Sequence, residues 1–384
     1  MQLFVESLFN GVAIGSVLLI AALGLAIVFG LMGVINLAHG ELMMLGAYTT
    51  YVVQLIFRLP ALQPFYDAYV IVALAVAFVV SGVVGILLER TVIRRLYGNP
   101  LETLLATWGV SLILQQFVRS VPLAYGAGLV VALFLGILLP LLLPDQLLNG
   151  VRGRFVRAGS WAFSALVGVL SAGWLASMIT KLGRPNARNV DVTAPAWMRG
   201  GIEWFDITLP VPRLVIIVIT IVSVLGVTWF LNRSAWGMRI RAVTQNRPMS
   251  DCLGIPTDTV DVLTFGIGSG LAGVAGVAVS LLGSVGPNVG GSYIVGCFMV
   301  VVLGGVGNLL GTVVASLAIG LMTDLIGAGR LLELWPDMPA SLASTVNFFA
   351  TTSMARVLIF ALIVAFLQFR PAGLFPQKGR LVEA

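Results

Sequence analysis

Three polar residues, Asn36, His39 and Glu41, lie close together within residues 31–48, a stretch that is otherwise apolar. Their side chains could exchange protons or hydrogen-bond a polar solute, and His39 is the only histidine of the chain. Ionisable groups at membrane depth cost roughly 2.5–3.5 kcal/mol each on insertion scales, so they are rare there without a role. Glycines bracket the cluster, which predicts an interrupted helix that brings polar groups to a pathway.

The partners that catalysis would require are missing from the sequence. There is no G-x-x-x-x-G-K-[ST] motif for ATP, and a single histidine excludes the metalloprotease motif HExxH. The glycines around Ser269 lack the spacing of a hydrolase nucleophile turn. Cys252 and Cys297 lie in segments of different kinds and form no disulfide or metal pattern. We therefore expect no enzyme, no metal site and no cofactor in this chain.

The composition is that of an integral membrane protein. Hydrophobic residues make up 59% of the chain and charged residues 10%, and the mean hydropathy is +1.03. Soluble domains carry about 25% charged residues. Long apolar runs favour helices over a barrel of alternating strands. The net charge of +6 is spread between apolar spans, which is typical of topology signals and lipid contacts and does not indicate nucleic acid.

Apolar spans of about 20 residues recur along the chain. They predict an all-α polytopic bundle of about nine or ten membrane segments, with interrupted helices in each half, in a single domain that comprises residues 1–384. The most basic segments are expected to face the cytoplasm: 90–95, 152–157, 232–258 and 370–380. The N-terminus then lies outside and the C-terminus in the cytoplasm, provided that residues 293–326 form two segments with a turn between them.

The segment 234–255 is too polar to span a membrane. Met238, Ala242 and Gln245 share one face of a helix by their spacing, and we expect Pro248 to end that helix. Such a helix, held parallel to the membrane, could dock into a partner and transmit its movement. A basic loop that is simply solvated in the cytoplasm is the alternative.

Glycines and two asparagines interrupt the second half of the chain. The passage 284–308 combines consecutive glycines with Asn288 and Asn308. Interrupted segments in both halves, here 31–41 and 284–308, are the best sequence pointer to a transport site. Turn chemistry between short helices is the competing interpretation for Asn288. The sequence therefore predicts a transport protein and leaves its energy source open.

Three passages resemble the inner-membrane permeases of ATP-binding-cassette (ABC) importers for branched-chain amino acids and amides. They are GLAIVFGLMGVINLAHGELMMLGAYTTYVVQ, RAVTQNRPMSDCLGI and VGPNVGGSYIVGCFMVVVLGGVGNLLGT. The passages ELMMLGAYTT, NVDVTAPAWMRGG and RAVTQNR make the chain most similar to permease subunits for urea. The chain departs from the family pattern in one respect, an additional membrane hairpin at 121–183 that we expect to be a tolerated peripheral addition.

The resemblance implies an importer in the bacterial inner membrane. A second homologous permease subunit would complete the pathway, and two cytoplasmic ATPase subunits would bind the ATP. A soluble external substrate-binding protein would dock on the outer loop 184–211, which contains Trp197 and Trp204. Segment 232–258 would couple the permease to the ATPases through a set of small, basic and polar residues: Gly237, Arg239, Arg241, Ala242, Asn246 and Gly254.

The candidate pathway residues are polar side chains and turn glycines: Asn36, His39, Glu41, Asn288, Gly304, Gly305 and Asn308. Amides suit a small neutral solute such as urea because they both donate and accept hydrogen bonds. Asn36 and His39 share one face if their helix is continuous. We expect His39 to be a hydrogen-bonded packing residue more than a substrate contact. We expect Glu41 near the cytoplasmic end, solvated or paired with an arginine.

Other transport classes remain open. A branched-chain amino acid permease of the same family is the nearest alternative. An ion-coupled secondary transporter or a passive urea or amide channel could also use broken helices and polar groups at the membrane midplane. Neither of these two classes requires partner ATPases or a basic docking segment.

Overall fold

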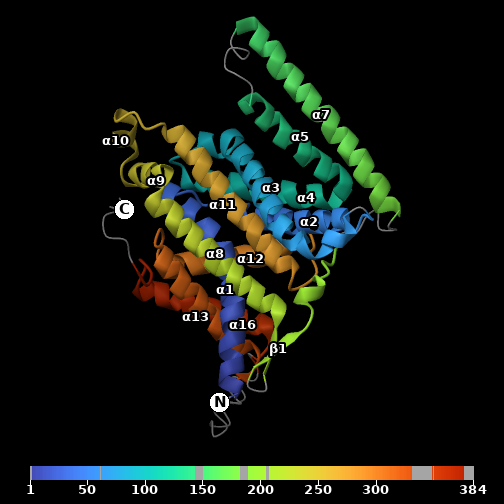
Figure 1. Ribbon diagram of the computed structural model, residues 1–384. Helices are drawn as coiled ribbons and strands as arrows, with labels where there is room; N and C mark the ends of the chain where they lie inside the picture. Colours follow the sequence, from blue (N-terminus) through green and yellow to red (C-terminus); the bar gives the residue numbers. More distant parts are fainter. Residues whose placement is uncertain are drawn as a thin grey trace.

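The computed structural model describes residues 2–60, 62–142, 150–181, 189–204, 207–330, 348 and 350–375. The chain is folded almost entirely into helices (Figure 1). The helices of the first half are α1 Gln2–Met32, α2 His39–Phe57, α3 Tyr69–Thr91, α4 Pro100–Ser120, α5 Leu123–Leu142 and α7 Gly150–Lys181. Those of the second half are α8 Val211–Arg233, α9 Ala235–Gln245, α10 Arg247–Cys252, α11 Thr257–Ser280, α12 Val289–Gly304, α13 Leu309–Gly327 and α16 Thr352–Phe369.

Short elements connect these helices. The 3₁₀ turns are η1 Gln63–Ala68, η2 Ile93–Leu96 and η3 Ala196–Met198. The strands β1 Gly201–Trp204 and β2 Ile207–Pro210 pair antiparallel, with Gly201 opposite Pro210 and Trp204 opposite Ile207. These strands form a small hairpin directly before α8.

Among the described residues, seven helical segments are long and apolar enough to cross a membrane. They are Val5–Met32, Gln63–Thr91, Pro100–Ser120, Ser160–Ser177, Val211–Arg233, Thr257–Ser280 and Leu309–Gly327. Three shorter apolar helices join them: Ala124–Gly136, Val289–Gly304 and Met354–Phe369. The structure therefore confirms an all-α polytopic membrane protein. The predicted turn between two segments in 293–326 is also present, because α12 ends at Gly304 and α13 begins at Leu309.

The core forms around α1 and α11. Helix α1 packs against α8, α11, α12 and α13, and α11 packs in addition against α2 and α3. Small residues permit close approach of backbones, which matters where lipid provides no hydrophobic drive between helices. A Cβ added to Gly46 of α2 would overlap the carbonyl oxygen of Gly273 in α11. This contact fixes α2 against α11.

The two ends of α13 show that the described ends of the chain lie at opposite ends of the bundle. Near its C-terminal end, Asp324 accepts a hydrogen bond of 2.7 Å from Ser7 at the start of α1. At its N-terminal end, the cap residue Asn308 donates to the carbonyl of Phe375. Figure 1 shows the same separation, with the β hairpin at the end that holds the start of α1 and α9 at the other. We call these the hairpin end and the α9 end.

Helices α5 and α7 form an antiparallel pair at one side of the bundle (Figure 1). Ala124 and Leu175 of this pair pack against Tyr48 and Tyr51 of α2. The basic segment 152–157 falls within the first turns of α7, which begins at Gly150, so it belongs to a helix.

Candidate functional site

The helix is interrupted where the sequence predicts it. Helix α1 ends at Met32, and Gly33 adopts φ +70°, a backbone conformation that favours glycine. Residues 33–38 then form a non-helical connection before α2 begins at His39. Asn36 and His39 therefore do not share the face of a continuous helix. Asn36 lies in the connection and His39 in the first turn of α2.

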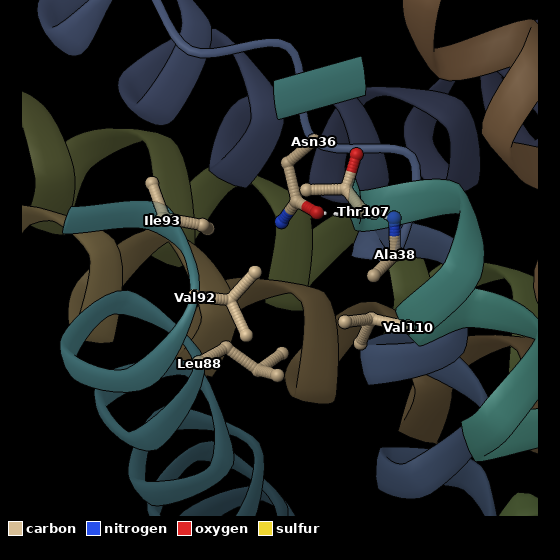
Figure 2. A pocket seen from close by; sticks show the side chains of 7 residues that line it. All are labelled: Asn36, Ala38, Leu88, Val92, Ile93, Thr107 and Val110. Atoms are coloured by element: carbon tan, nitrogen blue, oxygen red, sulfur yellow. Dashed lines mark hydrogen bonds between the residues drawn. The ribbon is translucent and has the colours of Figure 1, made fainter. Parts of the chain in front are cut away.

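Asn36 is buried, with 1% of its surface exposed. Its Oδ1 accepts a hydrogen bond of 3.0 Å from the backbone of Ala38, whereas its Nδ2 has no hydrogen-bond partner among the described residues. Figure 2 shows the amide nitrogen facing a narrow hollow whose other walls are mostly apolar. The lining residues are Asn36, Ala38, Leu88, Val92, Ile93, Thr107 and Val110. A buried amide donor without an acceptor is unusual and requires an explanation.

His39 is fully buried, and its Nε2 lies 3.0 Å from the carbonyl oxygen of Ala21 in α1. This geometry makes Nε2 the donor, so that the proton is on that nitrogen. The ring packs against Gly24, where an added Cβ would lie 2.9 Å from the imidazole. His39 is thus buried and hydrogen-bonded, and its role in packing as opposed to substrate contact stays a prediction. Its contacts also place the start of α2 beside the middle of α1.

Glu41 is neither solvated nor paired with an arginine, so that expectation is wrong. Only 1% of its surface is exposed, and its Oε1 accepts hydrogen bonds from Ser111 Oγ at 3.1 Å and Gln115 Nε2 at 2.7 Å. Both donors lie on α4. The other carboxyl oxygen, Oε2, is buried and has no hydrogen-bond partner in the described part of the chain. The neutral donors of α4 take the place of the arginine that the sequence suggested.

Helix α4 carries a polar stripe that sequence reasoning missed. Its members follow one another every fourth residue, so that each lies one turn from the next and the stripe winds gradually around the helix: Thr103, Thr107, Ser111, Gln115 and Arg119. Thr107 Oγ1 accepts from the backbone N–H of Leu37 at 3.2 Å and is the stripe member directly before Ser111. Arg119 donates to Asn288 at the other end. The i, i+4 spacing in an otherwise apolar span is the signal that could have revealed the stripe.

The two interrupted regions meet in space. A Cβ added to Gly40 at the start of α2 would overlap the carbonyl oxygen of Gly290 at the start of α12, and the reverse also holds. The predicted residues Asn36 and Glu41 from the first region and Asn288 from the second therefore lie along the same side of α4. Asn288 occupies the N-cap position of α12, but its side chain accepts from Arg119 and does not cap the helix.

The other predicted residues of the second region lie at the α9 end. Gly305 adopts φ +101° between α12 and α13. An added Cβ on Gly304 would lie 2.5 Å from the backbone of Gly311, so the two helices touch at their turn. Asn308 caps α13 by accepting 3.2 Å from Gly311, and it donates 3.3 Å to the carbonyl of Phe375. These three residues shape a turn, apart from the cluster of Glu41.

The segment 234–255 forms two short helices, α9 and α10. Ser234 caps α9 by accepting 2.8 Å from Gly237, and Asn246 caps α10 by accepting 3.0 Å from Met249. Pro248 does not end α9 as expected, since it lies in the first turn of α10. Proline is well tolerated there because the first turn requires no amide donor from it. Gly254 adopts φ +78° directly after α10.

Polar contacts anchor these short helices to the bundle. Arg247 forms an ion pair of 2.7 Å with Asp261 of α11 and stacks over Tyr97, 4.9 Å from the ring centre. Burial, together with the negative charges of Asp261 and Glu89, raises the pKa of Tyr97 well above its usual range. Movement of α10 would therefore displace α11 and the connection before α4, which Arg247 contacts at Asp261 and Tyr97.

The outward surface of α9 and α10 combines apolar and basic side chains. Met238, Met249 and Leu253 are exposed by 64%, 57% and 71%. Arg239 stacks on Trp236, and Arg241 donates only a weak bond of 3.3 Å to Asn232. Ala242 is half-buried behind this surface, while Gly237 is buried where an added Cβ would overlap the carbonyl of Leu231. Exposed methionines beside arginines are typical of a surface that binds another protein.

At the hairpin end, the described part of the loop 184–211 rests on α2, η1 and α3. Thr193 accepts at its carbonyl from Gln54 at 2.9 Å and from the Tyr69 hydroxyl at 2.7 Å. Trp197 is 48% exposed, with its ring nitrogen donating 2.9 Å to the carbonyl of Asp67. Trp204 lies at the end of β1, with its backbone alone described, and residues 184–188 fall outside the described residues.

Among the described residues, no group of three or more histidine, cysteine, aspartate or glutamate side chains is arranged to hold a metal ion. Cys252 is exposed and Cys297 is buried, and both are free thiols.

The family described as "Branched-chain amino acid transport system / permease component" matches residues 7–120 and 104–367. The high-affinity branched-chain amino acid transport system permease protein LivH of Escherichia coli K12 is 26% identical over 375 residues, 97% of this chain and 95% of the relative. LivH of Salmonella typhimurium is 25% identical over the same lengths. The permease protein BraD of Pseudomonas aeruginosa is 26% identical over 373 residues. No solved structure matches the chain.

Proposed function

The chain belongs to the family of permease components of branched-chain amino acid transport systems, and on this premise we propose that it is a transmembrane subunit of an ATP-driven importer. In this role it forms part of the path by which a small amino acid or amide crosses the bacterial inner membrane. The observation that carries the proposal is the meeting of two interrupted helical regions at Gly40 and Gly290 within a membrane bundle, with buried polar groups beside them. Broken helices of this kind expose polar groups to a transported solute.

The pathway residues follow from this geometry. Asn36 offers an amide donor without a partner, and Glu41 offers a carboxyl oxygen without a partner. Asn288 accepts a hydrogen bond from Arg119 and so continues this line of polar groups towards the hairpin end. We assign His39 a supporting role because its hydrogen bond to Ala21 fixes the start of α2. Gly304, Gly305 and Asn308 would form the turn at the α9 end of the path.

The energy would come from partner subunits. The surface of α9 and α10 has the mixture of exposed methionines and arginines that suits a protein partner. We propose that two ATPase subunits bind here, contacting Arg239, Arg241, Asn246 and Gly254, and that these subunits bind the ATP. The ion pair of Arg247 with Asp261 would carry their movement to α11. In this account the permease chain itself performs no chemical step.

The orientation follows from the same assignment. If α9 faces the cytoplasm, then the C-terminus does too and the N-terminus faces outwards, since the described chain ends lie at opposite ends of the bundle. Among the described residues, the ten apolar helical segments and α2 together make an odd number, which agrees with this orientation. The hairpin end, with exposed Trp197, would then receive a soluble substrate-binding protein. A second homologous permease would complete the pathway.

Two substrate classes are supported by different observations. The relatives that align over nearly the whole chain are named for branched-chain amino acids. The passages ELMMLGAYTT and NVDVTAPAWMRGG favour urea or a related amide instead. Uptake competition among leucine, urea and acetamide in the reconstituted complex decides between these classes.

Co-purification tests the importer proposal itself. Affinity purification of the full chain from its native membrane is expected to yield two P-loop ATPase subunits and a second permease in stoichiometric amounts. An ion-coupled transporter or a passive channel would be purified without ATPases. That result would overturn the importer proposal.

A further inference from the structure

The polar stripe of α4 lies beside two side chains of opposite charge, Glu41 and Arg119. Glu41 contacts this stripe at Ser111 and Gln115, and Arg119 lies one turn beyond Gln115 on the same face. The stripe thus places one acidic and one basic side chain beside the crossing of α2 and α12 at Gly40 and Gly290.

Only one of the two carboxylate oxygens of Glu41 has hydrogen-bond partners among the described residues. Only 1% of the surface of Glu41 is exposed, and its Oε1 receives two hydrogen bonds from α4. Its Oε2 receives none from the described residues. An unpartnered buried oxygen of an ionisable group carries a large desolvation penalty, which an incoming donor would relieve. Glu41 is therefore poised for a substrate that donates N–H groups.

Arg119 has the complementary capacity. Its side chain is exposed, and among the described contacts it donates to Asn288. A guanidinium carries five donors and binds carboxylates with two parallel hydrogen bonds. Arg119 and Glu41 do not form one of the ion pairs of the described residues. An acidic and a basic group that do not pair with each other present the two opposite charges that a zwitterion requires.

Helix α4 is also the element that could move to admit a substrate. Of its 21 residues only Thr103, Thr107 and Ser111 are buried, all on the polar stripe. The opposite face exposes large apolar side chains, for example Leu105, Trp108 and Ile113. A helix held mainly by hydrogen bonds can separate from its neighbours at a lower cost than one with an interlocked apolar core.

We propose that Glu41 and Arg119 form a recognition site for an α-amino acid, with the ammonium group on Glu41 Oε2 and the carboxylate on the Arg119 guanidinium. The inference rests on the proposed permease function and deepens it by selecting the substrate class. Ser111 and Gln115 position the Glu41 carboxylate, and Asn288 positions the guanidinium. Urea has no charged groups and leaves the arginine without its partner, so it is the poorer ligand for this site.

The test is equilibrium binding to the complex that co-purifies with the full chain, in nanodiscs and without the soluble binding protein. The probes are L-leucine, L-leucinamide, which lacks the carboxylate, 4-methylpentanoate, which lacks the ammonium group, and urea. The wild type is expected to bind leucine at least about 10-fold more tightly than each of the other probes, because a charge-assisted hydrogen bond is lost with either group. Tighter binding of urea than of leucine overturns the proposal.

Two variants assign the ends of the substrate. In Glu41→Gln the preference for leucine over 4-methylpentanoate should disappear, and in Arg119→Gln the preference for leucine over leucinamide should disappear. Arg119 is exposed, so its variant remains informative if Glu41→Gln fails to assemble. The matched controls are Glu102→Gln, exposed on the same helix, and Arg90→Gln, exposed at the end of α3. Unchanged selectivity in both test variants overturns the proposal.

The binding assay separates two kinds of failure. ATPase subunits absent from the purified complex contradict the proposed importer function, whatever the probes show. ATPase subunits present, together with equal affinities for leucine and leucinamide in the wild type, contradict the α-amino acid site alone.

Discussion

Gln115 on α4 donates a hydrogen bond of 2.7 Å to the buried carboxylate of Glu41 on α2. This bond and the one from Ser111 are the principal side-chain links between the two helices. They hold an ionisable group inside a membrane bundle with one oxygen satisfied and the other without a partner. The pair therefore connects the fold of the bundle with the path that we propose for the substrate.

Replacing Gln115 by leucine should weaken both the fold and transport. The change removes the stronger of the two donors to Glu41, and leaving a buried acceptor unsatisfied costs about 1–3 kcal/mol. We expect a lower melting temperature of the purified complex. We also expect uptake to fall by roughly 10-fold, which corresponds to a free-energy change of about 1.4 kcal/mol. Gln116→Leu is the control, since Gln116 bonds only within α4, to Ser120. Equal behaviour of the two variants would contradict the role of the Glu41 contact.

Gly40→Ala tests the crossing of the interrupted regions. The new methyl group would overlap the carbonyl oxygen of Gly290, so one of the two helices must move. Overpacking of this kind costs about 1–3 kcal/mol. We expect reduced thermal stability and strongly reduced uptake, measured at equal amounts in the membrane. Gly109→Ala on α4 meets nothing within 4 Å and should behave like the wild type. Wild-type uptake by Gly40→Ala would show that the crossing is not required.

Asn36→Ser separates the two ends of the Asn36 amide. Serine still offers an oxygen to the backbone of Ala38, though more weakly, but removes the unpartnered Nδ2. We expect the melting temperature to change little and uptake to fall several-fold at saturating substrate. Asn99→Ser, at an exposed amide before α4, is the control. If Asn36→Ser transports at the wild-type rate, the amide donor has no part in the pathway.

Arg241→Glu tests the coupling surface. Arg241 is exposed and holds only a bond of 3.3 Å to Asn232, so charge reversal should leave the permease fold intact. Like charges across an interface, or the loss of an attractive contact, should lower substrate-stimulated ATP hydrolysis by about 10-fold. Arg90→Glu lies outside α9 and α10 and provides the comparison. Full ATPase stimulation in Arg241→Glu would remove this surface from the coupling account.

The sequence was sufficient for the class of fold because its signals are local. Long apolar spans predict the membrane helices, and Gly33 and Gly305, both at positive φ, mark the interruptions. The burial of His39 could also be predicted, because this histidine lies in an apolar stretch of the sequence. These features depend on residues that are near each other in the chain, which is the range that periodicity can report.

The partners of Glu41 could not be read in the same way. Ser111 and Gln115 are about 70 positions away in the chain, and only the packing of α4 on α2 brings them together. The sequence suggested an arginine partner for Glu41 because a buried acid is often paired with a basic side chain. The expectation that Pro248 ends α9 was wrong for a local reason. Proline can end a helix or begin one, and here Asn246 caps α10 and places Pro248 in the first turn of that helix.

ATP-driven uptake tests the central claim most directly. The complex that co-purifies with the chain is reconstituted into proteoliposomes with its soluble binding protein, and labelled leucine is followed with and without ATP on the α9 side. The account predicts accumulation against a gradient that requires ATP hydrolysis and persists when a protonophore dissipates the proton gradient. Uptake that proceeds without ATP, or that collapses with the protonophore while ATP is maintained, would contradict it.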